Sequence, residues 1–349
     1  MTNTVQKNDK RIPVTVITGF LGAGKTTLLN NLIADINTAK FAIIVNEFGD
    51  IGIDSELIET ESEELIELSS GCICCVVRGD LIRALRALLI KKPFLEGIII
   101  ETTGLANPSP VIQTLIIDQV IGSQCRLDSV ICVVDAINIT DQLSLTNDAS
   151  DQIAFSDHIV LNKTQDATKQ VETIEEKVRN INPFARITKT NYGMVSSLEV
   201  LNQKGFDLAS IQTEINNDKS IGLDNLVGKN DEHSHINKSG ISSYSLSITA
   251  GPMNAEKVEK WLQDLLFRWG YDILRTKGVI WVSGEKRKLV IQAVNMLVEG
   301  DFGQLWNTDP PISRIVFIGR NLDREKLKTG FESCLQIQTC FKQGDETTF

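Results

Sequence analysis

The chain has 349 residues, of which 42% are hydrophobic and 23% charged, with 45 acidic residues against 35 lysines and arginines. These values are typical of a globular protein and exclude a disordered or fibrous chain, and the formal net charge of −10 disfavours nucleic acid or anionic lipid as the main partner. No segment approaches the roughly 18 apolar residues of a membrane helix, and residues 1–11 lack the apolar core of a secretion signal. The sequence therefore predicts a cytoplasmic protein.

The first half of the chain alternates between short β-rich runs and longer amphipathic stretches, which is the pattern of a parallel sheet covered by helices. Strands are expected at 14–17, 41–45, 97–100, 130–134, 158–161 and 185–188, and helices at 26–36 and 81–90. Residues 1–211 are therefore predicted to form an α/β domain.

The second half begins with a polar segment at 212–240 that lacks a regular apolar period, so we interpret it as a linker. Strand patterns follow at 241–249, 279–282, 289–294 and 315–318, and helical patterns at 258–269 and 323–334. Residues 241–341 are therefore expected to form a smaller α+β domain in the order β-α-β-β-β-α.

The strongest motif is the segment 19–26, GFLGAGKT, which follows a predicted strand and opens a predicted helix. In that context the glycines let backbone N–H groups close around phosphates, the lysine reaches the β- and γ-phosphate oxygens, and the threonine hydroxyl ligates Mg²⁺. The motif predicts a nucleoside-triphosphate site. The residues expected to bind the nucleotide here are Gly19, Gly22, Ala23, Gly24, Lys25, Thr26 and Thr27.

Acidic residues follow two other predicted strands. Glu101 ends one of them and Gly104 comes shortly after, at the positions where a P-loop enzyme senses Mg²⁺ and the γ-phosphate. Glu47 and Asp50 follow a second strand and either position the attacking water or belong to a solvated loop. The acidic run at 54–67 is expected in a solvated helix or loop. The predicted catalytic residues are Lys25, Thr26, Glu47 and Glu101, with Thr26 and Glu101 binding the Mg²⁺.

The predicted strand at 158–161 runs into Asn162-Lys163-Thr164-Gln165, which resembles the Asn-Lys-x-Asp element that reads guanine in GTPases. In that element the Asn and the Lys stem support the base, and the Asp accepts hydrogen bonds from two guanine donors. Gln165 replaces this Asp, and Asp166 comes one residue later. Guanine remains the favoured base, but selectivity against adenine should be weaker by roughly tenfold to a hundredfold than with Asp.

Three of the seven cysteines crowd into Cys72-Ile73-Cys74-Cys75, between the phosphate elements of the nucleotide domain. Their spacing is too tight for an ordinary disulfide framework, whereas three thiolates can converge on one soft or borderline cation such as Zn²⁺. A redox pair and three structural cysteines remain the alternatives. His233 and His235 in the linker are further candidate metal ligands, although two histidines in a polar stretch more often bind no metal.

These motifs, in this order, resemble those of the CobW-like family of P-loop metal-chaperone GTPases. The resemblance rests on residues 19–27, the Cys-x-Cys-Cys motif at 72–75, the Glu-x-x-Gly element at 101–104 and the partial guanine element at 162–165, and it spans almost the whole chain. It implies a P-loop α/β domain followed by a smaller α+β domain. It also implies slow hydrolysis of GTP with Mg²⁺, coupled to the binding and transfer of Zn²⁺ or, in some branches, Co²⁺.

The sequence therefore favours a GTP-hydrolysing metallochaperone that binds zinc through Cys72, Cys74 and Cys75 and passes it to a client metalloprotein, which the C-terminal domain recognises. Loss of the γ-phosphate would release the loops around Glu47 and Glu101 and change the metal affinity. Three rivals stay open: a cobalt-handling protein of cobalamin biosynthesis, a P-loop kinase of a small molecule, and a non-catalytic metal sensor. A homodimeric state is left open as well.

Overall fold

The computed structural model of the protein describes residues 9–36, 40–47, 64–69, 75–91, 95–168, 170–206, 240–306 and 311–336. Of residues 46–47, 64–69 and 75–78 it describes the backbone only. Within these ranges there is no helix with the length and apolar character to cross a membrane.

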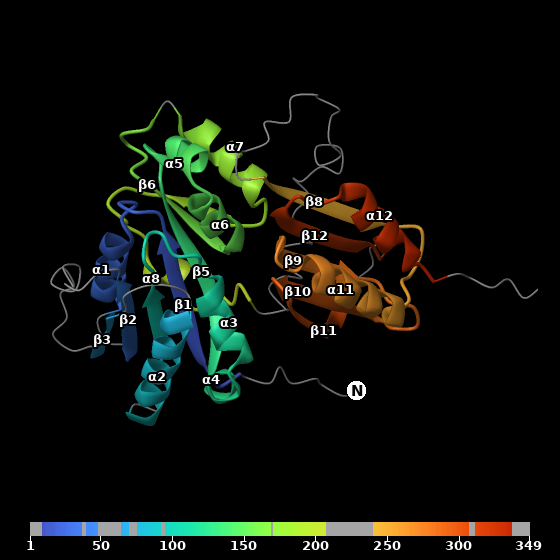
Figure 1. Ribbon diagram of the computed structural model, residues 1–349, viewed down its shortest axis with the longest axis horizontal. Coiled ribbons are helices and arrows are strands. Elements are labelled where there is room, and N and C mark those ends of the chain that lie inside the picture. The colour runs from blue at the N-terminus through green and yellow to red at the C-terminus, as the bar shows by residue number, and fades with distance from the viewer. Residues whose placement is uncertain are drawn as a thin grey trace, which may run out of the picture.

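The N-terminal part contains a seven-stranded sheet in the order β3-β2-β4-β1-β5-β6-β7 (Figure 1). Every pair of neighbouring strands in it is parallel, and the central strand β1 lies between β4 and β5. Strands buried on both faces need apolar residues throughout, which explains why these runs are rich in Val and Ile. The strands are β1 (Ile12–Gly19), β2 (Phe41–Glu47), β3 (Glu64–Ser69), β4 (Gly97–Glu101), β5 (Cys125–Asp135), β6 (His158–Asn162) and β7 (Arg186–Lys189).

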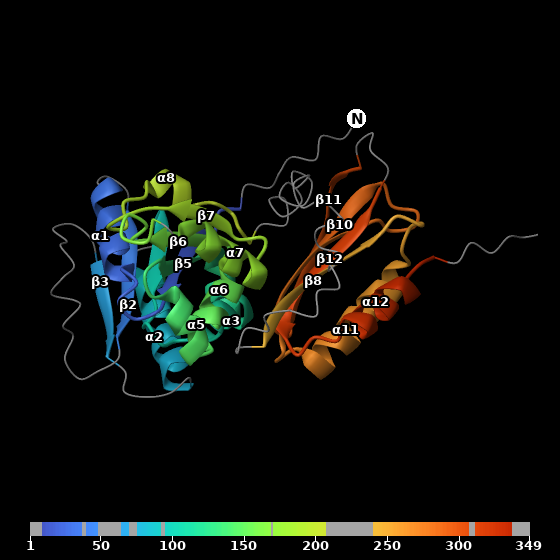
Figure 2. The same ribbon diagram turned by 90° about the horizontal axis from the view of Figure 1, so that it is seen from above.

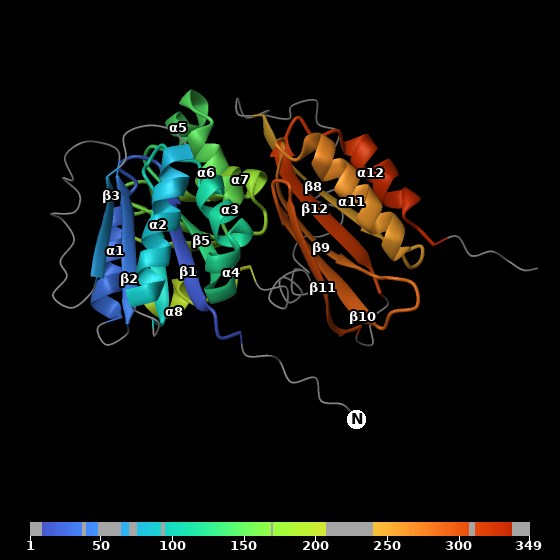
Figure 3. The same ribbon diagram turned by 60° about the horizontal axis from the view of Figure 1, so that its bottom comes forward.

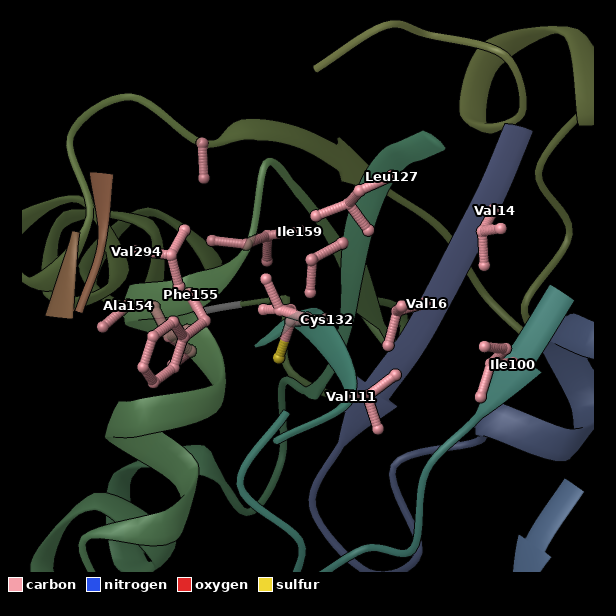
Figure 4. Close-up of a cluster of buried hydrophobic side chains, with 14 of the residues drawn as sticks. Val14, Val16, Ile100, Val111, Leu127, Cys132, Ala154, Phe155, Ile159 and Val294 are labelled. Atoms are coloured by element: carbon pink, nitrogen blue, oxygen red, sulfur yellow. The ribbon is translucent and has the colours of Figure 1, made fainter. Parts of the chain in front are cut away.

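Helices cover both faces of this sheet. One face packs against α1 through a buried cluster that includes Ile17, Leu28 and Val133. The other face forms the larger cluster, which includes Val16 of β1 and Cys132 of β5 (Figure 4). The helices are α1 (Lys25–Asp35), α2 (Cys75–Lys91), α3 (Ser109–Ile117), α4 (Gln119–Gln124), α5 (Ile139–Leu145), α6 (Asp148–Phe155), α7 (Val171–Ile181) and α8 (Ser197–Val200).

The C-terminal part contains a five-stranded antiparallel sheet in the order β11-β10-β9-β12-β8. Two helices cover one face of it, where the ring of Trp261 packs edge-on against Phe317 at 5.9 Å between ring centroids. The opposite face of the sheet is turned toward the N-terminal part (Figures 2 and 3). The elements are β8 (Ile241–Ile248), α11 (Ala255–Trp269), β9 (Ile273–Ile280), β10 (Arg287–Val294), β11 (Leu297–Leu305), β12 (Ser313–Arg320) and α12 (Arg324–Ser333).

The predicted fold class is confirmed, and some local predictions differ from the structure. The end of the acidic run forms strand β3 rather than a solvated helix or loop, and β11 was not predicted, so the C-terminal order is β-α-β-β-β-β-α. Strand β9 spans Ile273–Ile280, whereas a strand was expected at 279–282. Helix α2 spans Cys75–Lys91, whereas a helix was expected at 81–90. The predicted linker lies outside the described residues except for Gly240.

Candidate functional site

The glycine-rich segment forms a tight turn between the carboxyl end of β1 and the first residue of α1. Gly24 has a φ of 102°, and a Cβ atom there would lie 2.5 Å from Nδ2 of Asn162. Gly19 has a φ of 141°, and its Cβ would lie 2.3 Å from the carbonyl oxygen of Val133. Only glycine fits these two positions, because each combines an unusual φ with a close neighbour.

The start of α1 offers backbone N–H groups to an anion, because Gly24 at the N-cap has no side chain to cap them. Lys25 is buried and donates from Nζ to the carbonyl oxygen of Phe20 at 3.3 Å, so its ammonium group lies over the turn. The turn is closed by the N–H of Ala23, which donates to the same oxygen at 3.2 Å. This arrangement is a cradle for phosphate groups.

Glu101 ends β4, which pairs with β1 in the register Ile17 to Glu101. Its carboxylate is buried and accepts a hydrogen bond from Oγ1 of Thr26 at 3.0 Å. The next residue, Thr102, donates from Oγ1 to the Thr18 hydroxyl at 3.0 Å and so ties β4 to the end of β1. A hydroxyl and a carboxylate oxygen at this place form a donor set that suits Mg²⁺.

The loop after β4 touches the glycine-rich turn. A Cβ atom on Gly104 would lie 2.7 Å from the backbone nitrogen of Leu21, so the two backbones are in direct contact. From the other side, Nε2 of Gln152 donates to the carbonyl oxygens of Gly104 and Ala106, at 3.1 Å each. The loop is therefore held between the phosphate cradle and α6.

The predicted base element contacts the phosphate cradle directly. Asn162 donates from Nδ2 to the carbonyl oxygen of Ala23 at 3.0 Å and accepts at Oδ1 from the N–H of Gly193 at 3.1 Å. Lys163, with a φ of 61°, donates from Nζ to the carbonyl oxygen of Gly22 at 2.8 Å. Residues 22–24 and 162–163 thus form one continuous site.

Asp135, at the end of β5, is a site residue that the sequence analysis missed. It accepts hydrogen bonds from Nζ of Lys163 at 2.8 Å and from Nδ2 of Asn138 at 2.9 Å. Burial alone would raise the pKa of Asp135, but the hydrogen bonds from Lys163 and Asn138 outweigh it and hold the pKa below its usual value. The sequence feature that could have identified Asp135 is an acidic residue at the end of a strongly apolar strand.

The position that departs from the guanine element lies on the surface. Gln165 and Asp166 are both exposed, next to one another on the loop after β6. The N–H of Gln165 donates to Oδ1 of Asn191 at 2.8 Å, which joins this loop to a second one at 190–194. That second loop, which the sequence analysis did not identify, is fixed to α1 because Asn31 donates to the carbonyl oxygen of Tyr192 at 2.8 Å.

Several predicted residues lie where only the backbone, or nothing, is described. Cys72, Cys74 and Asp50 lie outside the described residues, and the side chains of Glu47 and Cys75 are likewise outside them. The cysteine segment follows β3, whose Ser69 is in register with Glu47 at the carboxyl edge of the sheet. Among the side chains that are described, no group of three His, Cys, Asp or Glu residues could hold a metal ion.

The remaining described cysteines and the one described histidine pack in the interior. Cys125, Cys132 and Cys334 are free and buried. Burial raises the pKa of the Cys132 thiol to about 12, so it stays protonated and unreactive at neutral pH. His158 is buried with Nε2 2.8 Å from the Thr188 hydroxyl. These residues have the structural roles predicted for Cys132 and His158.

A doubly covered parallel sheet with a glycine-rich turn between its central strand and α1 defines a P-loop nucleotide-binding protein. The CobW/HypB/UreG nucleotide-binding domain matches residues 13–189, and the C-terminal domain of the cobalamin synthesis protein cobW matches residues 241–335. The chain belongs to this family.

Two bacterial relatives are similar over nearly the whole chain. The zinc chaperone YjiA of Escherichia coli is 32% identical over 326 residues, which cover 92% of this chain and 98% of that protein. The zinc chaperone CobW of Pseudomonas aeruginosa is 28% identical over 359 residues, with 93% and 92% covered. The crystal structure of Zn(II)-bound YjiA GTPase from E. coli has a TM-score of 0.73 at 29% identity and covers 93% of this chain and 99% of its own.

A eukaryotic relative is similar over a shorter range. The zinc-regulated GTPase metalloprotein activator 1 of Schizosaccharomyces pombe is 33% identical over 252 residues, which cover 68% of this chain and 60% of that protein. The similarity therefore extends from bacteria to fungi.

Proposed function

We propose that this protein is a GTPase that carries a divalent metal ion, with zinc favoured, and delivers it to a client protein in a nucleotide-dependent way. The observation that carries the nucleotide half of the proposal is the direct junction of phosphate and base elements, in which Asn162 and Lys163 donate to the carbonyl oxygens of Ala23 and Gly22. The relatives named zinc chaperone and zinc-regulated GTPase support both halves of the proposal.

Hydrolysis uses the groups around the P-loop. The N–H groups at residues 22–26 and the Lys25 ammonium hold the phosphates and stabilise the charge that develops on them. Thr26 and Glu101 would hold Mg²⁺, which neutralises the β- and γ-phosphate charge when it is bound. Glu47, at the same edge of the sheet, orients the attacking water, and Gly104 offers its N–H to the γ-phosphate.

Guanine is read by Asn162, Lys163 and the loop that carries Gln165. The Lys163 stem covers one face of the base, while the ammonium group is held by Asp135 at 2.8 Å. A carboxamide at position 165 offers one acceptor oxygen, and the exposed Asp166 carboxylate lies next to it. GTP is therefore preferred over ATP, by a smaller margin than with Asp at this position.

Metal binding is assigned to Cys72, Cys74 and Cys75, which come shortly after β3 in the sequence. The last residue of β3, Ser69, is in register with Glu47. Thiolates in this spacing suit Zn²⁺, and Co²⁺ would bind the same donor set. In this proposal the P-loop domain comprises residues 1–211, the linker residues 212–240, and the domain that recognises the client residues 241–341.

The deciding experiment is a Zn²⁺ titration of the full chain in the presence of GDP or a non-hydrolysable GTP analogue. If the nucleotide state switches the metal site, the metal dissociation constant should differ between the two states. Metal must then change the nucleotide affinity by the same factor, because the two share one thermodynamic cycle. Replacing all three cysteines by Ser should abolish the binding, whereas the matched control Cys340→Ser should retain it. Equal dissociation constants in both states would contradict the switch.

A phosphate-release assay on the same protein separates the rivals. Turnover that depends on GTP and needs no phosphate acceptor agrees with the proposal. Transfer of phosphate to a small molecule would identify a kinase, and the absence of turnover at saturating metal and GTP would identify a metal sensor.

A further inference from the structure

Helix α6 lies between the loop after β4 and the C-terminal sheet (Figure 1). Gln152, in the middle of this helix, is fully buried. Its single amide nitrogen donates to both Gly104 and Ala106, at 3.1 Å each, and so fixes the loop on either side of Leu105. A displacement of this loop must stretch or break those two hydrogen bonds.

The neighbouring residue, Asp151, joins the same loop to the second domain. Its Oδ2 accepts from Nδ2 of Asn107 at 3.1 Å, and its Oδ1 forms an ion pair with Arg320 at the end of β12. Asn107 in turn accepts at Oδ1 from the N–H of Ser109 at 2.8 Å, at the start of α3. One carboxylate is thus shared between the loop and the C-terminal sheet.

A second contact links the end of the loop to that sheet. The hydroxyl of Ser109 donates to Oδ1 of Asn295, in the turn between β10 and β11. Gln113, one turn further along α3, donates to the same hydroxyl at 3.1 Å. The loop therefore has two separate polar links to the C-terminal domain.

Helix α6 itself is firmly attached to the C-terminal sheet. Arg275 of β9 donates from Nη1 to the carbonyl oxygen of Phe155 at 2.9 Å and pairs with Asp157, and all these groups are buried. Val294 belongs to the same apolar cluster as Phe155, and both point into it (Figure 4). Because packed interiors resist deformation, α6 and the C-terminal sheet should move together.

We propose that Gln152 and Asp151 are positioning residues for GTP hydrolysis, which hold residues 102–108 against the P-loop and transmit displacement of that segment to the C-terminal domain through Arg320. The inference rests on the proposed GTPase function. Gly104 is in backbone contact with the P-loop turn. Movement of Gly104 toward the phosphates of a bound nucleotide therefore strains the hydrogen bonds that this segment makes to Gln152 and Asp151 of α6. Asp151 is in turn paired with Arg320 of β12.

The first test measures hydrolysis by the full chain carrying Gln152→Met, which keeps the length of the side chain but cannot donate. We expect kcat to fall by about tenfold or more, because misplaced catalytic groups are costly, while the affinity for GDP is unchanged. The matched control is Gln142→Met, at a buried glutamine of α5 outside the loop contacts. Unchanged kcat in Gln152→Met would overturn the positioning role.

The second test uses intrinsic fluorescence. All four tryptophans, Trp261, Trp269, Trp281 and Trp306, lie in the C-terminal half, so their emission reports on that domain alone while nucleotide binds to the other. The wild type should show different emission with GDP and with a non-hydrolysable GTP analogue. The difference should become smaller in Arg320→Gln, which removes one of the two polar links between the loop and the C-terminal sheet. It should be unchanged in Arg287→Gln, whose arginine pairs with Glu285 within its own domain.

The outcomes separate the two proposals. Equal emission in both nucleotide states of the wild type, or a difference that Arg320→Gln leaves undiminished, would overturn the coupling. Absence of GTP hydrolysis by the wild type would instead overturn the proposed function. If the wild type hydrolyses GTP and Gln152→Met has the same kcat, only the positioning role of Gln152 is ruled out.

Discussion

The hydroxyl of Thr26 donates to a carboxylate oxygen of Glu101 at 3.0 Å, although the two residues are 75 positions apart in the chain. The parallel pairing of β1 and β4 brings them together, because the carboxyl ends of both strands lie at one edge of the sheet. Thr26→Ala should lower the rate of GTP hydrolysis by roughly a hundredfold to a thousandfold, whereas Thr26→Ser should keep most of it. Phosphate release at saturating GTP and Mg²⁺ measures this, and equal losses in both variants would show that the hydroxyl is not the important group.

Asn162 should control nucleotide affinity through its contact with the P-loop. In Asn162→Asp the side chain keeps its shape but cannot donate to the carbonyl oxygen of Ala23, and a negative charge lies beside it. We expect the GDP dissociation constant to rise about tenfold or more, since a buried acceptor left unpaired costs about 1–3 kcal/mol. Titration of a fluorescent guanine nucleotide tests this. Wild-type affinity in the variant would show that Asn162 does not support the site.

Gln165 offers a test of base selectivity. Gln165→Asp restores a carboxylate for the two guanine donors, so the preference for GTP over ATP should sharpen by roughly tenfold to a hundredfold. Competition of ATP against a labelled guanine nucleotide measures the ratio. Asp166→Asn is the control for the neighbouring carboxylate. If the preference for GTP over ATP is unchanged in Gln165→Asp but lower in Asp166→Asn, Asp166 reads the base. A preference of the wild type for ATP would contradict the GTPase assignment.

His158 should make the protein sensitive to acid. Burial lowers the pKa of His158 to about 4, against about 6.5 in the unfolded chain. Between these values the unfolded state binds more protons than the folded state, so the free energy of unfolding decreases as the pH falls from 6.5 to 4. The full effect is about 3 kcal/mol, because each tenfold change in proton affinity corresponds to about 1.36 kcal/mol.

Urea unfolding of the wild type and His158→Gln between pH 4 and 7 tests this prediction, because the variant should lose that part of the pH dependence. The comparison with the variant is essential, since burial raises the pKa of Asp151 to about 6 and works in the opposite direction over part of the same range. Parallel stability curves for the two proteins would contradict the assignment.

The sequence was sufficient for elements whose signal is local. The P-loop is recognisable because the turn and the start of α1 are contiguous, and the central strands are recognisable because burial on both faces makes them uniformly apolar. The two missed strands, β3 and β11, both lie at the edge of a sheet. Edge strands commonly carry charged residues that prevent further pairing, so acidic residues conceal them in a sequence.

Long-range contacts were the part that sequence patterns could not provide. Gln152 and Gly104 are 48 positions apart, and Asp151 and Arg320 are 169 positions apart. Neither pair belongs to a motif, because a buried glutamine or aspartate on a short helix has no characteristic spacing. Asp135 was overlooked for a similar reason, since its role depends on Lys163, which comes from another strand end.

The apolar cluster that holds Phe155 also contains Leu274, Val294 and Ile318 from the C-terminal sheet. Severing the chain between the two parts would uncover this surface and leave the buried Asp157 without its arginine. The nucleotide-binding part should therefore be poorly soluble when produced alone. The intact protein should melt cooperatively, with a single calorimetric transition whose enthalpy reflects both sheets rather than two independent steps.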